Sequence, residues 1–435
     1  MQGDVQEVRH RHLSQGWRIC RVQQDNLFRI ANVLKIKGGF LRILKLNLTN
    51  REWILLVVLF LIEFTRGAFF LTFLPVYAVK YLGISVASVG LAVSAHYLME
   101  TLSKGMAGLL FDRHGRPVVL AGLIIALAGI WGLSFSTGPL GQFIAAAVFG
   151  LGISPVWPAV ISLVAPVDMP GRASRMGAVF TFWLSGMGAG PVLINFAISH
   201  SYNMAIWLLI VLYISAVTTA FWVFPKEKNT GKVPAGSLWG ELKRLAALPA
   251  VTRILLPGMF LQTMAASLLL PVLPLYASAV LGLNHNQYAF LLISGGAATL
   301  VFLVPMGKLV DSLPLKILLS AGFSFSALFL FVFTLVQNYL FIFLLAALVG
   351  ISYAIVLPAW NALLARVISV KLQATGWGIF GTIEGLGIAA GPALGGIIAN
   401  MLGPAGTVYC SSIILTILAL FYLLYPVDSS LQKEG

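Results

Sequence analysis

Five charged side chains lie within stretches of sequence that are otherwise almost entirely apolar: Glu63, Arg66, Glu100, Lys104 and Glu384. A charge at the centre of a bilayer costs about 2.5–3.5 kcal/mol, whereas a Leu or Ile gains only about 0.3–0.6 kcal/mol. Charged groups persist there when they bind one another, a proton or a polar ligand. We therefore expect these five residues to face a cavity or each other.

The spacing of these residues places them on two helix faces. Glu63 and Arg66 are three residues apart and share one face of a helix. His96, Glu100 and Lys104 follow one another at intervals of four residues and form a second polar stripe. Carboxylates can take up and release protons, and an unperturbed imidazole titrates at about pH 6.5. We predict proton-coupling roles for Glu63, His96, Glu100 and Glu384.

Each of these residues also has a structural interpretation. Glu63 and Arg66 could form an ion pair that only holds two helices together, and His96 could be a neutral packing residue. Lys104 is close to a helix end, where its long side chain can extend to the membrane surface, so a structural role is favoured for it. For Glu384, in a Gly-rich stretch, we favour a cavity-facing carboxylate.

The composition is that of a polytopic membrane protein. Of the 435 residues, 59% are hydrophobic and only 10% are charged, and the mean hydropathy is +0.93. A helix needs roughly 20 apolar residues to cross a bilayer core of about 30 Å, and backbone groups in lipid must be satisfied within the segment. We predict an all-α membrane protein with twelve transmembrane helices, at residues 53–79, 86–111, 118–137, 141–165, 175–199, 204–224, 254–281, 286–310, 315–336, 339–365, 374–402 and 405–425.

The basic residues predict the orientation of the chain. Of the 28 Lys and Arg residues, all but Lys80, Arg66 and Lys104 fall in the two tails or in every second loop. Such loops remain in the cytoplasm, so we expect a multi-pass protein of the cell membrane with both termini cytoplasmic. The net charge of +14 then reflects the topology of the chain. We expect the basic residues to contact the anionic lipids of the inner leaflet and not a nucleic acid.

Three further signals are absent or excluded. The first apolar run follows a basic, polar segment and is too long for the core of a cleavable signal, so we expect none. Cys20 and Cys410 would lie on opposite sides of the membrane, which excludes a disulfide between them. No metal cluster, cofactor motif or nucleophile with its base is visible, so an enzyme is not expected. We expect a monomer.

The sequence contains an internal repeat. A shift of 199 residues aligns FLPVY (73–77) with VLPLY (272–276), and Gly83 with Gly282. We therefore predict two six-helix pseudo-repeats. The predicted organisation is a basic cytoplasmic N-tail (1–51), an N-terminal six-helix bundle (52–224), a cytoplasmic linker (225–253), a C-terminal six-helix bundle (254–425) and a C-tail (426–435).

At the same shift, charged residues of the first half align with neutral residues of the second. Glu63 aligns with Gln262, and Glu100 with Thr299. A cavity between the halves would be polar on one wall and largely apolar on the other, which suits an amphiphile better than a sugar or an ion. Both tryptophans among the expected contacts also have a packing interpretation. We predict substrate contacts at Arg66, Trp157, Gln262, Trp360 and Asn361.

The loop after the second predicted helix carries a motif. GLLFDRHGRPVV (108–119) has a weaker copy, GKLVDSLPLK (307–316), six helices later. With twelve predicted helices, the pattern resembles the signature of the major facilitator superfamily and covers residues 51–425. The resemblance implies the major facilitator fold and a conformational latch, and the alternative is a loop that is merely positive inside. The implied latch residues are Gly108, Asp112, Arg113, Arg116 and Asp311.

Two helices carry small residues at intervals of three and four before a proline. These stretches are GMGAGP (186–191) and GIAAGPALGG (387–396). Small residues allow helix backbones to approach closely, and proline bends a helix. A similar motif in proton-coupled antiporters of the superfamily implies a seal against leakage, but close packing is the favoured interpretation.

A narrower resemblance extends through both halves. The chain is similar to the lipoteichoic-acid anchor glycolipid flippases of Gram-positive bacteria. This likeness implies proton antiport and a diglucosyl-diacylglycerol substrate, with Glu63 and Arg66 as the coupling and headgroup pair, Glu100 as an acidic site residue and Trp157 near the headgroup. The alternative function is a proton-driven exporter of amphipathic drugs or small metabolites. The matching segments are EFTRG (63–67), HYLME (96–100), SPVW (154–157), LPAWN (357–361), TGWGIF (375–380) and GPALGG (391–396).

Overall fold

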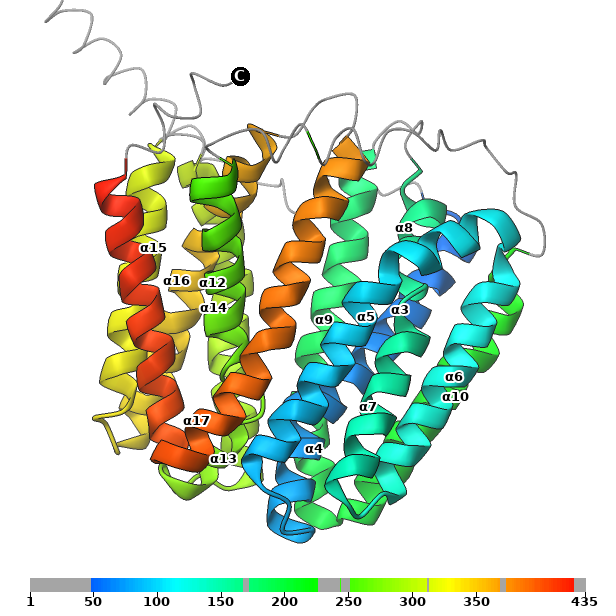
Figure 1. The fold of residues 1–435 in the computed structure, drawn as a ribbon, viewed down its shortest axis with the longest axis horizontal. Helices are drawn as coiled ribbons and strands as arrows, with labels where there is room; N and C mark the ends of the chain where they lie inside the picture. Colours follow the sequence, from blue (N-terminus) through cyan, green and yellow to red (C-terminus); the bar gives the residue numbers. More distant parts are fainter. Residues whose placement is uncertain are drawn as a thin grey trace, which may run out of the picture. The chain divides into compact units, whose positions relative to one another are not determined.

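The computed structural model describes residues 48–166, 172–225, 243, 251–310, 313–367 and 373–425. The chain divides after Thr49 into two units, and all helices named below belong to the second. The described part is helical, with turns and short loops between the helices (Figure 1). This confirms the predicted all-α class. The N-tail, the linker and the C-tail lie almost wholly outside the described residues.

The helices fall into two runs along the chain. Before residue 225 the segments are α3 (Asn50–Ala68), η1 (Phe69–Phe73), α4 (Leu74–Val76), η2 (Tyr77–Tyr81), α5 (Val86–His114), α6 (Arg116–Phe135), α7 (Pro139–Ile153), α8 (Val156–Val164), α9 (Arg172–His200) and α10 (Tyr202–Val223). After residue 250 they are η3 (Val251–Leu255), α12 (Leu256–Ser267), α13 (Leu273–Ala279), α14 (His285–Val310), α15 (Leu315–Phe333), α16 (Tyr339–Ala365) and α17 (Gln373–Leu424). The segments η1, η2 and η3 are π-helical.

Within the described residues, nine helical segments are long and apolar enough to cross a membrane, by length and composition. This is a multi-pass membrane protein, as predicted. The helix α5 is not among the nine, and it carries Glu100 and Lys104 in its middle. The stretch 256–279 is broken by a turn between α12 and α13. The last of the nine segments includes Gly403, whose φ of 75° and ψ of 168° are not helical.

The packing of the helices follows their small residues. Before residue 225, α3 packs along α9 and α10, and α5 packs along α7. After residue 250, α12 packs along α17, and α14 packs along α16. Between the two runs, α17 packs along α5 and α14 along α9. Gly186 and Gly190 of α9 lie against the backbone of α3, where a Cβ on Gly186 would be 2.5 Å from Phe60 O. Gly387 and Gly391 of α17 lie in the same way against α12. The GMGAGP and GIAAGPALGG stretches are therefore packing surfaces.

The turns that follow α4–η2 and α13 share one backbone conformation. Leu82 N donates to Tyr77 O, and Leu281 N donates to Tyr276 O, 199 residues later. Each turn contains a glycine with φ near the left-handed region, 67° at Gly83 and 66° at Gly282. A residue with a Cβ is strained at such a φ, which accounts for glycine at both positions.

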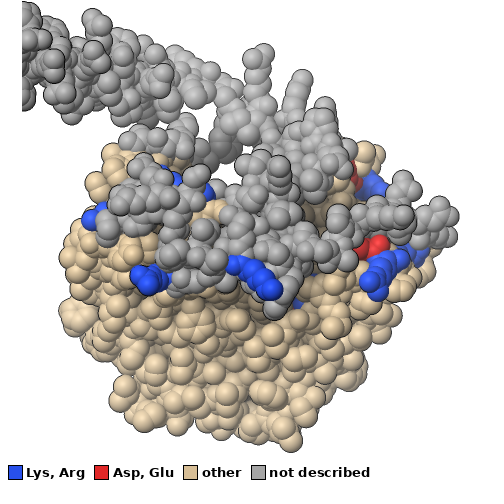
Figure 2. Space-filling model, turned by 45° about the horizontal axis from the view of Figure 1, so that its top comes forward, with Lys and Arg blue, Asp and Glu red and all other residues tan. Residues whose placement is uncertain are grey.

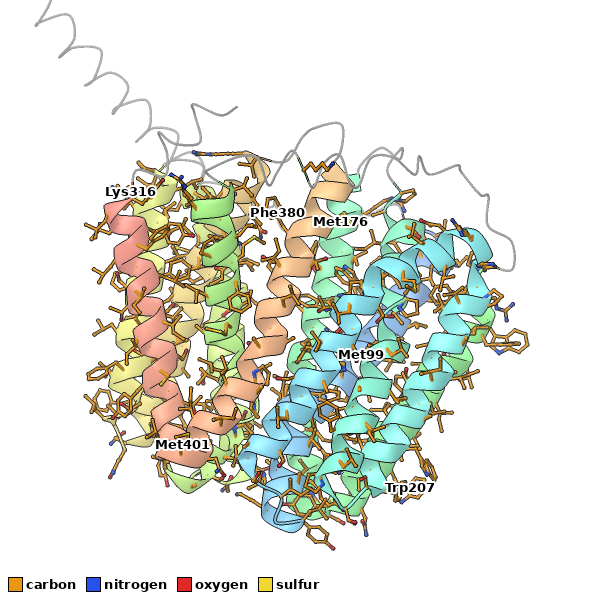
Figure 3. The ribbon with its side chains drawn as sticks, viewed as in Figure 1. Met99, Met176, Trp207, Lys316, Phe380 and Met401 are labelled. Atoms are coloured by element: carbon orange, nitrogen blue, oxygen red, sulfur yellow. The ribbon has the colours of Figure 1, made fainter. Side chains whose placement is uncertain are left out.

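The two ends of the helices carry different side chains. Figure 3 labels Met176 and Lys316 at one end, and Trp207 and Met401 at the other. The first of these ends also holds the start of α3 and of α6 and the end of α10. We call it the basic end, and its described basic residues include Arg51, Arg113, Arg116, Arg175, Arg253 and Lys316. In the view of Figure 2, described Lys and Arg side chains gather toward this end, and the surface below them is free of charge.

Candidate functional site

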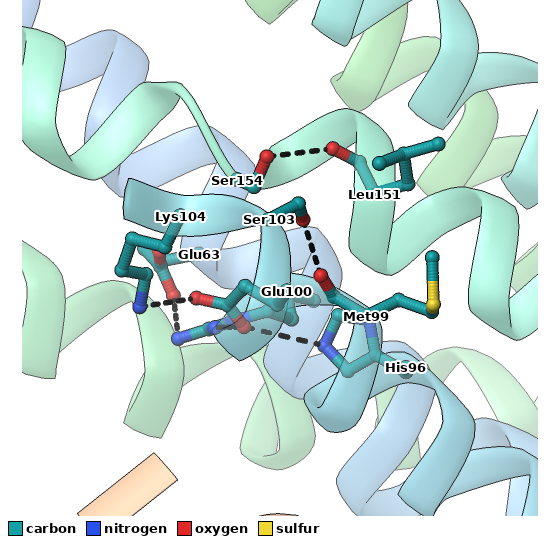
Figure 4. Close-up of polar contacts among 9 residues, drawn as sticks. Glu63, His96, Met99, Glu100, Ser103, Lys104, Leu151 and Ser154 are labelled. Atoms are coloured by element: carbon teal, nitrogen blue, oxygen red, sulfur yellow. Dashed lines mark hydrogen bonds and ion pairs between the residues drawn. The ribbon is translucent and has the colours of Figure 1, made fainter. Parts of the chain in front are cut away.

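A buried ion network joins α3 to α5. Arg66 lies between two carboxylates: its Nη2 is 2.5 Å from Glu63 Oε2, and its Nη1 donates to Glu100 Oε2 at 2.7 Å. Lys104 Nζ is 2.9 Å from the other oxygen of Glu100, Oε1. Figure 4 shows Glu100 between its partners. Glu63, Arg66 and Glu100 are only 3%, 4% and 7% exposed.

The network is formally neutral, with two carboxylates and two cations. Burial of a single unpaired charge is strongly unfavourable, because the charge loses its hydration without gaining a partner. A proton added to Glu63 or Glu100 would therefore leave an excess positive charge on Arg66 or Lys104. The arrangement can couple proton uptake to a change of partners, which is the chemistry that the spacing of these residues predicts.

Access to the network is from one side. The Lys104 side chain is 40% exposed, whereas those of the other three members are exposed by 10% or less. Lys104 is one turn closer to the basic end than Glu100, because α5 ends at His114. The site therefore opens toward the basic end.

Aromatic rings enclose the network from the opposite side. Arg66 Cζ lies 6.0 Å from the centre of the Tyr97 ring. The His96 ring is fully buried and stacks on Phe70 with 4.1 Å between ring centres, and Phe149 packs at 5.2 Å. Neither nitrogen of His96 has a hydrogen-bond partner among the described residues, and Nε2 is 3.8 Å from Glu100 Oε2. This environment favours the packing interpretation of His96.

The packing of α9 fixes the position of Glu63. A Cβ on Gly186 would be 3.0 Å from Glu63 Cβ, so the two backbones are in close contact beside the carboxylate. One turn further along, Gly190 lies against Phe64 O. The small residues of α9 thus set the distance between α3 and its neighbour at the point where Glu63 and Arg66 project.

The helices α5 and α17 are in close contact over part of their length. Gly90 lies against the backbone of Pro392, and Ser94 Oγ accepts a hydrogen bond of 2.8 Å from Ala393 N. The contact continues to Thr101, since a Cβ on Gly385 would be 2.5 Å from Thr101 Oγ1. We call the contact from Gly90 to Thr101 the α5–α17 seam.

Beyond Thr101 the two helices separate toward the basic end. A Cβ on Gly105 or on Gly381, each one turn beyond the seam, would meet no atom within 4 Å among the described residues. Glu384 is half-buried at this point of α17 and lies beside Trp360 of α16. Glu100 precedes Thr101 on α5, and Glu384 precedes Gly385 on α17, so both carboxylates lie at about the same height along the helices, where the seam ends.

The residues predicted to contact substrate occupy different environments. Trp157 of α8 is half-buried against Phe180 and Trp183, at ring distances of 5.4 and 5.6 Å. Gln262 of α12 is half-buried. Trp360 is 2% exposed and packs on Tyr422 with 6.0 Å between ring centres.

Asn361, the residue after Trp360, is exposed. The structure thus brings Arg66 together with the acidic residues and places Trp360 in the core of the later helices. The contacts of all five residues with a substrate stay predictions.

The residues of the predicted latch that the structure describes lie near the end of α5 and the start of α6. Gly108 packs on Pro158 of α8, where a Cβ would be 3.6 Å from Pro158 Cβ, and Arg113 is exposed. Arg116 Nη2 donates to Phe221 O at the end of α10. Asp112 is half-buried, and Asp311 lies outside the described residues. The latch stays a prediction.

Two polar contacts of α3 were missed from the sequence. Tyr97 is three residues before Glu100 and beneath Arg66, a position that the helical spacing could have indicated. Arg175 of α9 binds Glu52 of α3, with 2.5 Å between Nη1 and Oε1. These two residues are 123 positions apart, and no local pattern predicts their contact.

No group of three His, Cys, Asp or Glu suited to a metal ion occurs among the described residues.

Comparisons with known proteins agree with this architecture. The family model described as Major Facilitator Superfamily matches residues 55–256 and 255–435. A proton-coupled antiporter flippase LtaA of Staphylococcus haemolyticus is 31% identical over 384 residues, covering 86% of this chain and 94% of the relative. The protein of the same name from Staphylococcus aureus strain N315 is 30% identical over 379 residues, covering 85% and 93%.

Solved structures show the same fold at low sequence identity. The nucleoside transporter NupG superposes with a TM-score of 0.71 and 15% identity, over 86% of this chain and 98% of that one. A bacterial homologue of the human lysosomal transporter Spinster, in an inward-facing and occupied conformation, gives a TM-score of 0.72 and 13% identity, over 88% and 97%. This protein therefore belongs to the major facilitator superfamily, as its motif at residues 108–119 predicted, and it is a transporter and not an enzyme.

Proposed function

We propose that this protein is a proton-coupled secondary transporter that flips a lipid-linked sugar across the cell membrane by alternating access. The observation that carries the proposal is that one cation, Arg66, is shared by two buried carboxylates, Glu63 and Glu100. A shared cation responds to the loss of either partner, so a proton on one carboxylate changes what Arg66 can bind.

The proposed cycle follows from the charges. With Glu63 and Glu100 ionised, each terminal nitrogen of Arg66 contacts a carboxylate, and Arg66 holds α3 to α5. Ionised Glu63 and Glu100 can also accept hydrogen bonds from the hydroxyl groups of a sugar headgroup. A proton on either carboxylate removes that charged acceptor and changes the contact of α3 with α5 through Arg66. Proton and sugar headgroup thus compete for the same carboxylates, which is the requirement for antiport.

We propose the topology that the repeat predicts: twelve spans in two six-helix halves. The nine apolar segments, together with α5, the broken stretch α12–α13 and the division of α17 at Gly403, account for twelve. The matching turns at Gly83 and Gly282 support the repeat. The basic end, with Arg51 and Arg113 among its residues, is proposed to face the cytoplasm. We propose that the protein acts as a monomer.

We infer the substrate class from the unequal distribution of charge. Helices α12–α17 contain one acidic residue within a predicted span, Glu384, whereas the earlier helices contain the whole ion network. A polar wall opposite a largely apolar one suits a glycolipid, whose sugar and acyl chains differ in the same way. The relatives named proton-coupled antiporter flippase support this inference.

The experiment is flipping of a fluorescent diglucosyl-diacylglycerol by purified protein in vesicles under a pH gradient, with a membrane-impermeant quencher. We expect wild-type protein to move the lipid and Glu63→Gln to abolish the gradient-dependent part. Glu52→Gln is the matched control, because Glu52 is also ion-paired and lies on the same helix, outside the network. Glu52→Gln should keep coupling.

Two outcomes would contradict the proposal in different ways. Efflux of ethidium without movement of the lipid would replace the flippase by an exporter of amphipathic drugs or small metabolites. Full transport by Arg66→Ala would show that the Glu63–Arg66–Glu100 arrangement is only structural.

A further inference from the structure

A pocket at the basic end lies apart from the ion network, between the start of α3 and the end of α10. It has a volume of about 520 Å³ and is lined by Arg51, Ile54, Thr218, Thr219, Trp222 and Val223. A smaller cavity of about 200 Å³ shares Arg51 and Trp222 and adds Arg116 from the start of α6. None of the described residues lining either cavity is acidic.

The two arginines of this site are held by the end of α10. Arg51 Nε donates to Val223 O at 2.8 Å, and Arg116 Nη2 donates to Phe221 O. Arg116 Cζ also lies 4.3 Å from the centre of the Phe221 ring. These contacts use one N–H of each guanidinium, and Arg116 Nε is buried without a partner among the described residues. Donors therefore remain on both arginines for a ligand that offers several oxygens.

The apolar side of the pocket is continuous with the membrane-facing surface of α10. Trp222 is 82% exposed and Phe221 is 50% exposed, on a helix that is apolar enough to cross the membrane. Trp207 lies 15 residues earlier on the same helix, or about 22 Å along its axis. Tryptophan is enriched at both membrane–water interfaces, and this separation suits residues near the two interfaces. The arginines thus lie at headgroup level beside lipid.

We propose that this pocket binds the headgroup of an anionic phospholipid, with its phosphate on Arg51 and Arg116. The glycerol and the first part of the acyl chains then pack against Trp222, Ile54 and Val223. Two cations without a carboxylate favour a headgroup with net negative charge over a zwitterionic one. The apolar lining favours a lipid over free phosphate, which would leave Trp222 and Ile54 uncovered. The site is independent of which substrate the transporter moves.

Native mass spectrometry of the full chain in detergent tests the proposal, with phosphatidylglycerol and phosphatidylcholine added at equal concentration. We expect wild-type protein to retain phosphatidylglycerol preferentially. Replacing both arginines, Arg51→Gln with Arg116→Gln, should weaken its binding by about tenfold or more. The matched control is Arg253→Gln with Lys316→Gln, which removes the same charge from the same end and should change binding by less than about twofold.

Further variants separate binding from folding. Arg51→Lys with Arg116→Lys keeps the charge but loses the planar guanidinium, and it should bind phosphatidylglycerol with intermediate affinity. Trp222→Leu changes no charge and should weaken binding if the acyl chains pack there. The proposal would be overturned if the two Gln double variants lost phosphatidylglycerol binding to the same extent. It would also be overturned if wild-type protein retained phosphatidylcholine as well as phosphatidylglycerol. Competition by inorganic phosphate as strong as that by added phosphatidylglycerol would also overturn it, in favour of a free-phosphate site.

Discussion

Arg66 on α3 binds Glu100 on α5 at 2.7 Å, while its other terminal nitrogen binds Glu63 on its own helix. The cation is therefore part of a local pair and of a pair between helices at once. The Glu63 pair depends on the spacing along one helix, whereas the Glu100 pair depends on how α3 and α5 are packed. A change in either carboxylate is transmitted to the other through one planar guanidinium.

Replacement of Arg66 should reveal how much the network contributes to stability. Arg66→Ala leaves two buried carboxylates with Lys104 as the one cation, and we expect a loss of about 3–5 kcal/mol in the free energy of unfolding. Arg66→Lys should recover part of the loss, because an ammonium is a point charge and does not form the two-pronged contact. Thermal unfolding in detergent measures both. An unfolding temperature of Arg66→Ala equal to that of wild-type protein would contradict the prediction.

His96 should act through packing and not through its proton. Its ring is enclosed by Phe70 and Phe149, and neither nitrogen has a partner among the described residues. We expect His96→Phe to leave the pH profile of transport unchanged, whereas His96→Ala should cost about 2–4 kcal/mol in unfolding free energy by leaving a cavity. The measurement is the transport rate as a function of pH. A shifted profile in His96→Phe would restore the proton-coupling interpretation.

Two glycines of α9 should differ in their tolerance of alanine. A Cβ on Gly190 would overlap Phe64 O of α3, while one on Gly188 would meet no atom within 4 Å. We expect Gly190→Ala to destabilise the protein by about 1–3 kcal/mol. Gly188→Ala is the matched control and should be neutral or slightly stabilising, since alanine favours a helix more than glycine does. Similar unfolding temperatures for the two variants would argue against the close contact of α3 with α9.

The α5–α17 seam should loosen when a methyl group is inserted at Gly90, which lies against the backbone of Pro392. We expect Gly90→Ala to expose Ser94, whose Oγ accepts the hydrogen bond of Ala393 N. The readout is the maleimide labelling rate of Ser94→Cys in a background in which Cys20 and Cys410 are replaced by serine. Gly105→Ala, one turn beyond the seam, is the control and should leave labelling unchanged. Equal rates in both variants would refute a seam that depends on glycine.

Local spacing allowed much of the site to be predicted. Glu63 with Arg66 and Glu100 with Lys104 are three and four residues apart, and the helix places such pairs in contact. That the two stripes would meet followed from the cost of an unpaired charge in the membrane. The helices themselves followed from hydropathy, and the non-helical Gly403 lies in the gap between the last two predicted spans, 374–402 and 405–425.

Contacts between distant segments could not be predicted in this way. Arg116 binds the end of α10, 105 residues away, because α6 and α10 are neighbours in the fold and not in the sequence. Trp360 packs on Tyr422, and the sequence LPAWN is compatible with either a cavity wall or a core. A tryptophan side chain suits either a cavity wall or a packed core, and tertiary packing decides which of the two surrounds Trp360.

The position of Glu100 beside the end of the α5–α17 seam has a mechanical consequence. The helix α5 is uninterrupted from Val86 to His114, and among the described glycine contacts between α5 and α17 the one at Thr101 is nearest to the basic end. If α5 tilted by about 20° about Thr101, His114 would move by about 7 Å and Glu100 by only about 0.5 Å, from the rise of about 1.5 Å per residue. Glu100 therefore lies close to the point about which α5 would pivot. Rocking displaces the backbone of Glu100 far less than the end of the helix, so a change of charge is the more direct way to break its bond to Arg66.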